Sequence, residues 1–511
     1  MAEEKYIRQK VRPNPVLSFF QRFFVIEKLN NWLGFLLIGS IAGIFGYLLA
    51  NDFMVGAGAI AVIMGIAILL LCVLSVEWGL YINLIFLFIC THLSRLYFND
   101  NLPVGVVADV LMLATFMGLF VGNYDVKENS RAFFSKRPVI FYLVVLGYLC
   151  LQLMNPYGHS LQGWFLVVRK VFESFVIIFI SYNVFTDLSK IMNFLRVLFV
   201  CALVAGLYGC IQQWHGLFPF EINWVHSNEL RQNLIYLFGN YRKFSFFVGP
   251  TEFGIIMAGC AMLFTLLGIN ERRRIYQAFL LGGSVIMLLG MSYSGTRTAN
   301  AMFVGGVGLY ILLTLHKRAT RIFAVFSLLV FLFIMFAPIY SSETIIRFRT
   351  SFSASEDASY NVRESNRASI QPYIYSHPFG GGLGTTGENG QKYTPGHELA
   401  GFPTDSSYLS KSLETGWIGM ILTCILYFIT IRYAIRGYFA TRNPRAKVLF
   451  AAISAFLFAY YIGEIAQEAI GQFSNTMVYF PVVAILLQLR HQTTKERKED
   501  TLTSDGQHQN Y

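Results

Sequence analysis

The feature that most constrains this chain is a succession of apolar runs, each long enough to cross a lipid bilayer as a helix. One crossing takes roughly 20 apolar residues, and about fourteen such segments follow one another along the sequence. Inside hydrocarbon every backbone polar group needs an internal partner, which an α-helix provides. The predicted fold is therefore an all-α polytopic membrane protein with about 14 transmembrane helices. The predicted segments are 32–50, 53–76, 78–97, 103–122, 138–154, 162–183, 191–213, 244–268, 275–292, 298–315, 321–340, 411–433, 446–467 and 473–489.

Composition agrees with this interpretation. The chain is 55% apolar and 14% charged, with a mean hydropathy of +0.51, which excludes a soluble globule with a polar shell. The N-terminal stretch "MAEEKYIRQKVRPNPVLSFF" has no short apolar core followed by a cleavage site, so no removable signal peptide is expected. All seven cysteines fall in apolar runs without paired spacing, which argues against a disulfide framework or a metal site.

The charge of the connections predicts the orientation. Connections such as "VKENSRAFFSKR", "NERRR" and "IRGYFATRNPRAK" are basic, whereas the short connections between them, such as "NPYGHSLQG" and "EAIGQ", contain no Lys or Arg. Because cytoplasmic loops retain basic residues, both termini are predicted to be cytoplasmic. The predicted regions are a cytoplasmic basic tail at 1–31, transmembrane helices 1–11 at 32–340 with an outer loop at 214–243, a large outer loop at 341–410 carrying short helices, transmembrane helices 12–14 at 411–489 and a cytoplasmic tail at 490–511.

The large outer loop contains a glycine-rich run, "YSHPFGGGLGTTGENG", at 375–390. The run lacks the Lys-Ser/Thr that follows the glycines of a P-loop, and nucleotides are absent on the outer side of the membrane. A nucleotide cradle is therefore excluded. Two roles remain open: the run can present backbone N–H groups to an anion, or it can let the chain pass close to a neighbour.

Several motifs around this run occur in a fixed order. An Arg opens a predicted short helix in "VRESNRASIQPYIYSHPFGGGLG", and "TDSSYLSKSLETGWIG" leads into the next span. Upstream, "MSYSGTRTANAMF" places an Arg at a predicted outer helix start. Taken together with the topology, this order resembles the O-antigen ligase and polymerase family (Wzy-like). The detailed resemblance covers 363–420, and the topological resemblance covers the whole chain.

The resemblance implies a metal-independent glycosyltransferase that uses an undecaprenyl pyrophosphate-linked glycan donor. Arg297 and Arg363 match arginines that are thought to hold the pyrophosphate in this family. The chemistry is consistent, because a guanidinium group binds phosphate oxygens bidentately and stays charged at any working pH. The alternatives are a membrane-interface anchor for Arg297 and a solvated loop charge for Arg363.

Asp405 stands where ligases of the family typically carry a His, just before the Tyr-Leu helix. A carboxylate at this position can act as general base for an acceptor hydroxyl, and it can equally cap the helix that follows. His377 and His397 are alternative bases in the same loop, and His377 joins Asp405, Arg297 and Arg363 in the predicted catalytic set. His397 and Glu414 are assigned to the substrate-binding set, with loop hydrogen bonding and helix packing as their respective structural alternatives.

Three further basic residues complete the predicted substrate-binding set. Arg169 and Lys170 lie about two turns inside a predicted span, where a charge is costly and suggests a function. They are predicted to line a lipid-phosphate site, although Arg169 and Glu173 also have the i, i+4 spacing of a structural ion pair. Arg367 follows Arg363 by one helical turn and is predicted to bind substrate.

The predicted function is polymerisation of lipid-linked repeat units into a surface polysaccharide (O-antigen, capsule or exopolysaccharide) at the outer face of the bacterial inner membrane. One alternative is a ligase that transfers glycan to lipid A core or protein, and the other is a flippase for lipid-linked oligosaccharides. The expected partners are the lipid-linked glycan donor, the glycan acceptor, membrane lipids and a chain-length regulator. No metal, no cofactor and no nucleic acid are expected.

Overall fold

The computed structural model describes residues 32–508 except 99, 123, 159, 238, 339–342, 351–357 and 405. The side chains of 33, 37, 53, 54, 57, 343, 344, 347, 350, 358–363 and 497–508 also lie outside the described residues. Helices dominate the described residues, and each of the fourteen predicted segments coincides with a helix. The long helices are α2 (Trp32–Asn51), α3 (Phe53–Leu74), α4 (Val76–Phe98), α5 (Val104–Val121), α7 (Arg137–Leu151), α8 (Leu161–Val184), α9 (Leu188–Trp214), α12 (Pro250–Ile269), α13 (Arg274–Tyr293), α14 (Arg297–Thr314), α15 (Arg318–Phe336), α19 (Ser407–Ala440), α20 (Pro444–Ala466) and α21 (Thr476–His508).

Ten helices among the described residues are long and apolar enough to span a bilayer, so the protein is an all-α, multi-pass membrane protein. The other four long helices, α3, α8, α14 and α21, fall outside those limits. In α8 the reason is visible in the sequence, because Arg169, Lys170 and Glu173 interrupt its apolar run.

Short elements fill the predicted outer loops. The first loop contains α10 (Pro219–His226), α11 (Glu229–Ile235) and an antiparallel pair of two-residue strands, β1 (Tyr236–Leu237) and β2 (Asn240–Tyr241). The second contains α16 (Glu343–Thr350), α17 (Ala358–Ser376) and α18 (Gly387–Tyr393), as expected of a loop with short helices. The remaining short elements are α6 (Val126–Phe134) and η2 (Gln152–Met154).

The chain divides into two compact units. The first comprises 1–83 and 105–130, and in it Asn83 of α4 donates to Thr115 of α5 through Nδ2 and Oγ1, 3.0 Å apart. The second comprises 84–104 and 131–511 and holds every predicted site residue. The functional argument therefore concerns the second unit alone.

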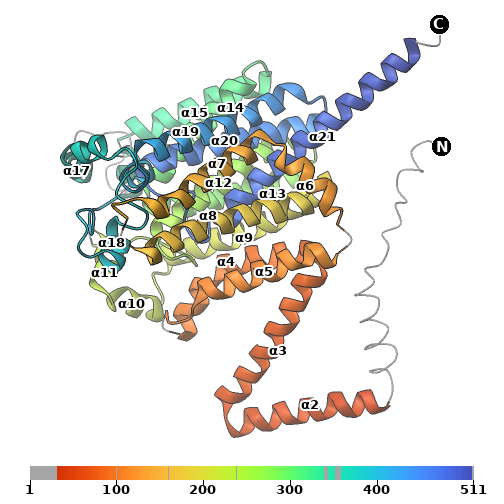
Figure 1. Cartoon of the computed structure of the whole chain (residues 1–511), viewed down its shortest axis with the longest axis vertical. Coiled ribbons are helices and arrows are strands. Elements are labelled where there is room, and N and C mark those ends of the chain that lie inside the picture. Colours follow the sequence, from red (N-terminus) through yellow and green to blue (C-terminus); the bar gives the residue numbers. More distant parts are fainter. Residues whose placement is uncertain are drawn as a thin grey trace. The chain divides into compact units, whose positions relative to one another are not determined.

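Helix α12 forms the core of the second unit. It packs against α9, α13, α14 and α20, and 83% of the residues in its apolar stretch are buried. It begins at Pro250 and not at 244 as predicted, because the Gly249–Pro250 turn starts the helix and proline at the first position lacks an N–H that would need a partner. The short helices α10, α11, α17 and α18 gather at one end of this unit, which we call the loop end (Figure 1).

Candidate functional site

The glycine-rich run binds to a break in α19. Gly416 lies inside this helix with φ 69° and ψ 177°, which interrupts the helical hydrogen bonds. The carbonyls that lose their helical partners at the break accept hydrogen bonds from other donors. Gly381 N–H donates to Leu413 O (2.7 Å), and Gly382 N–H donates to Glu414 O (3.0 Å). The Tyr148 hydroxyl donates to Thr415 O (2.7 Å). The broken helix and the run therefore satisfy each other's backbone groups.

The opposite side of the run rests on the connection between α7 and α8. Asn155 Nδ2 donates to the carbonyls of Phe379 (3.1 Å) and Gly380 (3.0 Å). A Cβ on Gly382 would lie 2.5 Å from the Cα of Gly158, so the two backbones are in contact. These contacts favour the conformational role of the run: its glycines allow close backbone approach, and the N–H groups of Gly381 and Gly382 are already used.

Glu414 and His397 take part in holding this loop. The Glu414 carboxylate accepts hydrogen bonds from Thr386, at 2.6 Å from Oγ1 and 3.4 Å from N. His397 Nδ1 accepts from Leu399 N–H at 3.1 Å. The contact of His397 agrees with its alternative of loop hydrogen bonding, whereas Glu414 bonds to the loop, a contact that its helix-packing alternative did not include. Their assignment to substrate binding stays a prediction.

His377 is held in a defined orientation at the start of the run. Its ring stacks on Tyr373, with centroids 4.0 Å apart, and meets the edge of Tyr157 at 4.7 Å. Its Nδ1 lies 3.0 Å from Tyr373 O and 2.9 Å from Ser376 Oγ; in the tautomer that donates from Nδ1 to the Tyr373 carbonyl, Nε2 is an acceptor. Burial raises the pKa of the Tyr373 phenol to about 12, which keeps that ring neutral. In that tautomer the Nε2 of His377 can act as a general base.

The neighbours of the predicted residues Asp405 and Arg363 meet at the end of α20. Ser406 Oγ donates to Glu464 O (3.3 Å), and Arg367 Nη2 donates to Ile465 O (3.3 Å). Asp405 and the side chain of Arg363 lie outside the described residues. Arg363 nevertheless belongs to α17, one turn before Arg367, and residues four apart share a helix face. Ser406 stands at the N-cap position of α19 without a side-chain capping hydrogen bond, and the capping role of Asp405 stays a prediction.

Arg297 begins a helix that runs antiparallel to α20. A Cβ on Gly463 would lie 2.7 Å from Met302 Sδ, and a Cβ on Gly306 would lie 3.0 Å from Ala455 O. Residue numbers therefore increase along α14 in the direction in which they decrease along α20. Arg297 precedes Met302 by about 7.5 Å of helix at the usual rise. The start of α14 therefore lies level with the last turn of α20, where Ser406 and Arg367 bind.

Sequence reasoning missed two basic residues at the same turn. Arg242 Nε donates to Ser294 O (3.0 Å) and its Nη2 to Thr296 Oγ1 (3.1 Å), immediately before Arg297. Lys243 is buried, and its backbone N–H donates to Tyr293 O (3.3 Å). The sequence did contain a signal for them. Arg242 and Lys243 lie directly before the predicted span 244–268, whereas the short outer connections contain no Lys or Arg.

Arg169 and Lys170 of α8 are both ion-paired. Arg169 Nε lies 2.6 Å from Glu173 Oε1 one turn along the same helix, which is the structural pair given as its alternative. Lys170 Nζ lies 3.1 Å from Glu468 Oε1, just beyond the end of α20. Lys170 thus reaches the end of α20. The predicted lipid-phosphate role of both residues stays a prediction.

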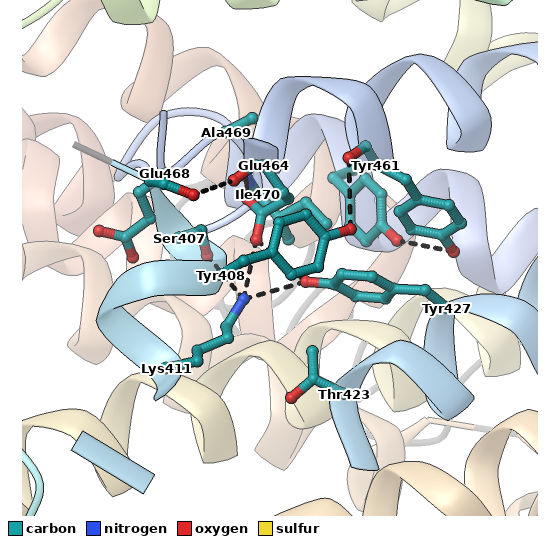
Figure 2. A network of polar contacts seen from close by, with 12 residues as sticks. Ser407, Tyr408, Lys411, Thr423, Tyr427, Tyr461, Glu464, Glu468, Ala469 and Ile470 are labelled. Carbon is teal, nitrogen blue, oxygen red and sulfur yellow. Dashed lines mark hydrogen bonds and ion pairs between the residues drawn. The ribbon is translucent and has the colours of Figure 1, made fainter. Parts of the chain in front are cut away.

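A polar network joins α19 to α20 at this position. Lys411 Nζ contacts Ser407 Oγ (2.7 Å), Tyr427 Oη (3.1 Å) and Glu464 Oε2 (2.8 Å) (Figure 2). Tyr427 also donates to Glu464 Oε2 at 3.0 Å. Neither Lys411 nor Glu464 was singled out from the sequence, because the two lie far apart in the chain and only the antiparallel packing of their helices brings them together.

The comparisons with known proteins fall on this region. Residues 282–424 match the family model described as O-antigen ligase. The matched residues run from within α13 into α19, and they include the α13–α14 turn, the glycine-rich run and the break at Gly416. A search of the curated proteins finds no match. Through residues 282–424, the chain is thus similar to the O-antigen ligase family.

Proposed function

We propose that this protein polymerises lipid pyrophosphate-linked oligosaccharide repeat units into a surface polysaccharide at the outer face of the bacterial inner membrane, with both termini in the cytoplasm. The proposal rests chiefly on one observation. The turn before Arg297, to which Arg242 binds, lies level with one end of α20. Ser406 and Arg367, the neighbours of Asp405 and Arg363, bind the same end of α20. The O-antigen ligase domain covers most of these residues.

The transfer needs cationic groups for the leaving pyrophosphate and a base for the acceptor hydroxyl. The bond between the anomeric carbon and the phosphate oxygen breaks, and the lipid pyrophosphate leaves with the electron pair. The acceptor hydroxyl oxygen bonds to the anomeric carbon and gives its proton to a base. Arg297, Arg242 and Arg363 stabilise the leaving pyrophosphate by charge and by paired hydrogen bonds, without a metal ion. Asp405 takes the proton, and His377 Nε2 is the second candidate base.

The position of the charges favours an enzyme over a flippase. A flippase needs polar groups along a path through the membrane centre, whereas the candidate groups described above gather at the loop end. A ligase remains the closest alternative in chemistry. Asp405, which replaces the His typical of ligases, favours polymerisation.

Reconstitution tests the proposal directly. Purified protein in proteoliposomes is given a lipid pyrophosphate-linked repeat unit, and the products are resolved by size. A polymerase yields a ladder of glycans on the lipid from this single substrate. A product that forms only when lipid A core is added identifies a ligase, and passage of the unit across the bilayer without a larger product identifies a flippase. Either of these two outcomes rejects the proposal.

Replacing Asp405 with Asn will separate the two candidate bases. The amide keeps the size of the side chain and removes its ability to take a proton, so the rate of chain extension should fall by about 100-fold or more if Asp405 is the base. The measurement is the initial rate of polymer formation in proteoliposomes, with His377→Gln as the paired variant. A normal rate in Asp405→Asn together with a strongly reduced rate in His377→Gln assigns the base to His377.

A further inference from the structure

Lys170 of α8 and Glu468 of the connection between α20 and α21 form an exposed ion pair. Lys170 Nζ lies 3.1 Å from Glu468 Oε1, and the two side chains are 47% and 60% exposed. Within the described part of the chain, Lys170 Nζ has this one partner, and Glu468 Oε2 accepts no hydrogen bond. The pair therefore keeps two N–H donors and one carboxylate oxygen for a further ligand.

The pair lies beside the candidate site. Glu468 follows Ile465 by three residues, which span at most about 11 Å of chain, and Ile465 O accepts a hydrogen bond from Arg367 Nη2 at 3.3 Å. Figure 2 shows the Glu468 carboxylate turned away from the network of Lys411 and Glu464. The pair with Lys170 is therefore a separate feature of the same end of α20.

The position of Lys170 along α8 indicates a polar space around the pair. Lys170 follows Leu161, the first residue of α8, by nine residues, or roughly 14 Å at the usual helical rise. The exposed apolar side chains Phe165 and Phe172 lie roughly 140° and 160° around the helix from Lys170. Charges inside a spanning helix face the bundle interior or a water-filled cavity and mark substrate paths. An exposed ion pair contributes little to stability, so a ligand explains this pair better than folding does.

The charges of the pair favour a neutral ligand that carries hydroxyl groups. A phosphate bound to Lys170 would also lie close to the Glu468 carboxylate, and the two negative charges would repel each other. A sugar ring offers hydroxyls that can donate to the carboxylate and accept from the ammonium group. The distance from Lys170 Nζ to Glu468 Oε1 is also close to the separation of two neighbouring hydroxyl oxygens on such a ring. This argument counts against the lipid-phosphate role predicted for Lys170.

We propose that Lys170 and Glu468 bind a sugar ring of the glycan substrate through two neighbouring hydroxyl groups. The proposal rests on the proposed function, because it names the sugar contacts of the site whose arginines take the pyrophosphate. Gly471 belongs to this sugar site. A Cβ on Gly471 would lie 2.1 Å from Glu468 Oε1, so the missing side chain leaves the space that the carboxylate occupies.

Binding of the lipid-free repeat-unit glycan to the purified protein, measured by saturation-transfer difference NMR in detergent, tests the sugar site. Glu468→Gln should raise the Kd for the glycan by about 10-fold or more, the order expected when a hydrogen bond to a charged group is lost. The double variant Lys170→Met, Glu468→Gln keeps the net charge. It should weaken glycan binding at least as much and leave the Kd for undecaprenyl pyrophosphate unchanged.

Gly471→Ala displaces the carboxylate and keeps both charges. Gly471 is not among the glycines with a positive φ, so alanine fits its backbone, and the midpoint of thermal unfolding should stay close to that of the wild type. The Kd for the glycan should rise as it does in Glu468→Gln. The matched control is Lys392→Met, which removes an exposed lysine from α18 and should change neither affinity.

The possible outcomes separate the sugar site from its alternatives. Wild-type glycan affinity in both Glu468→Gln and Gly471→Ala overturns the proposal and leaves the pair a surface ion pair. A double variant that loses affinity for undecaprenyl pyrophosphate but not for the glycan also overturns it, in favour of the lipid-phosphate role.

A transfer assay with a tagged lipid-free glycan as acceptor identifies which sugar is bound. A raised KM for this acceptor alone in Glu468→Gln places the pair at the acceptor sugar, and a raised KM for the lipid-linked donor alone places it at the donor sugar. Either result supports the sugar site. A wild-type protein that binds the glycan but forms no polymer overturns the proposed function and not the sugar site, so the two failures are distinguishable.

Discussion

Replacing Arg297 with Ala is expected to abolish chain extension while the protein remains folded in the membrane. Arg297 begins α14 directly after the turn that Arg242 binds, level with the end of α20. Loss of one preorganised donor to a developing negative charge typically lowers kcat by about 100- to 1,000-fold. The measurement is polymer formation from the lipid-linked repeat unit in proteoliposomes, with the amount of folded protein checked by size-exclusion chromatography in detergent.

Two matched variants sharpen this test. Arg297→Lys keeps the positive charge and loses the planar fork, so it should retain only part of the activity. Arg274→Ala removes an exposed arginine from the start of α13, and it should not change the rate of polymer formation. Near-normal polymer from Arg297→Ala would remove this residue from the mechanism and leave the interface-anchor interpretation.

Replacing Gly416 with Ala is expected to release the glycine-rich run from α19. The backbone at Gly416, with φ 69° and ψ 177°, is essentially restricted to glycine, and another residue there costs about 1–3 kcal/mol. The added Cβ would also lie 1.9 Å from Pro378 O, so the run would have to move. We expect a lower midpoint of thermal unfolding, faster proteolysis of the loop and loss of polymer formation.

Gly308 provides the control for this substitution. It lies inside α14, where an added Cβ would have no heavy atom within 4 Å, and alanine is favoured over glycine in a helix by about 0.5–1 kcal/mol. Gly308→Ala should therefore leave the unfolding midpoint equal or slightly higher. If Gly416→Ala behaves in the same way, the run is not held by the break, and the account of the glycines given above fails.

Much of the fold could be predicted because the membrane restricts what a segment can form. An apolar run in hydrocarbon has to become a helix, so the positions of all fourteen long helices followed from hydropathy alone. Helix starts were less certain where local turn chemistry decides them, as at Pro250. The break at Gly416 was missed for a related reason: a single glycine in an apolar run does not reveal whether other donors will satisfy the carbonyls it frees.

The candidate site was predictable only where the residues form a motif. Arg297, Asp405 and the glycine-rich run lie in stretches that resemble the family, and residues 282–424 match its model. Arg242 and Lys243 come from outside the matched region. Their place beside the turn between α13 and α14 became visible only from the hydrogen bonds of Arg242 to Ser294 and Thr296.

By itself, the sequence determined that this protein crosses a membrane many times, that it carries two long loops and that part of it resembles the O-antigen ligase family. Hydropathy and local motifs are properties of contiguous residues, so they can be read without a structure. Which groups share one site was decided by the tertiary structure. The antiparallel packing of α14 and α20, and the contact of Lys411 with Glu464, join residues that are distant in the chain, and only side-chain packing between helices selects such partners.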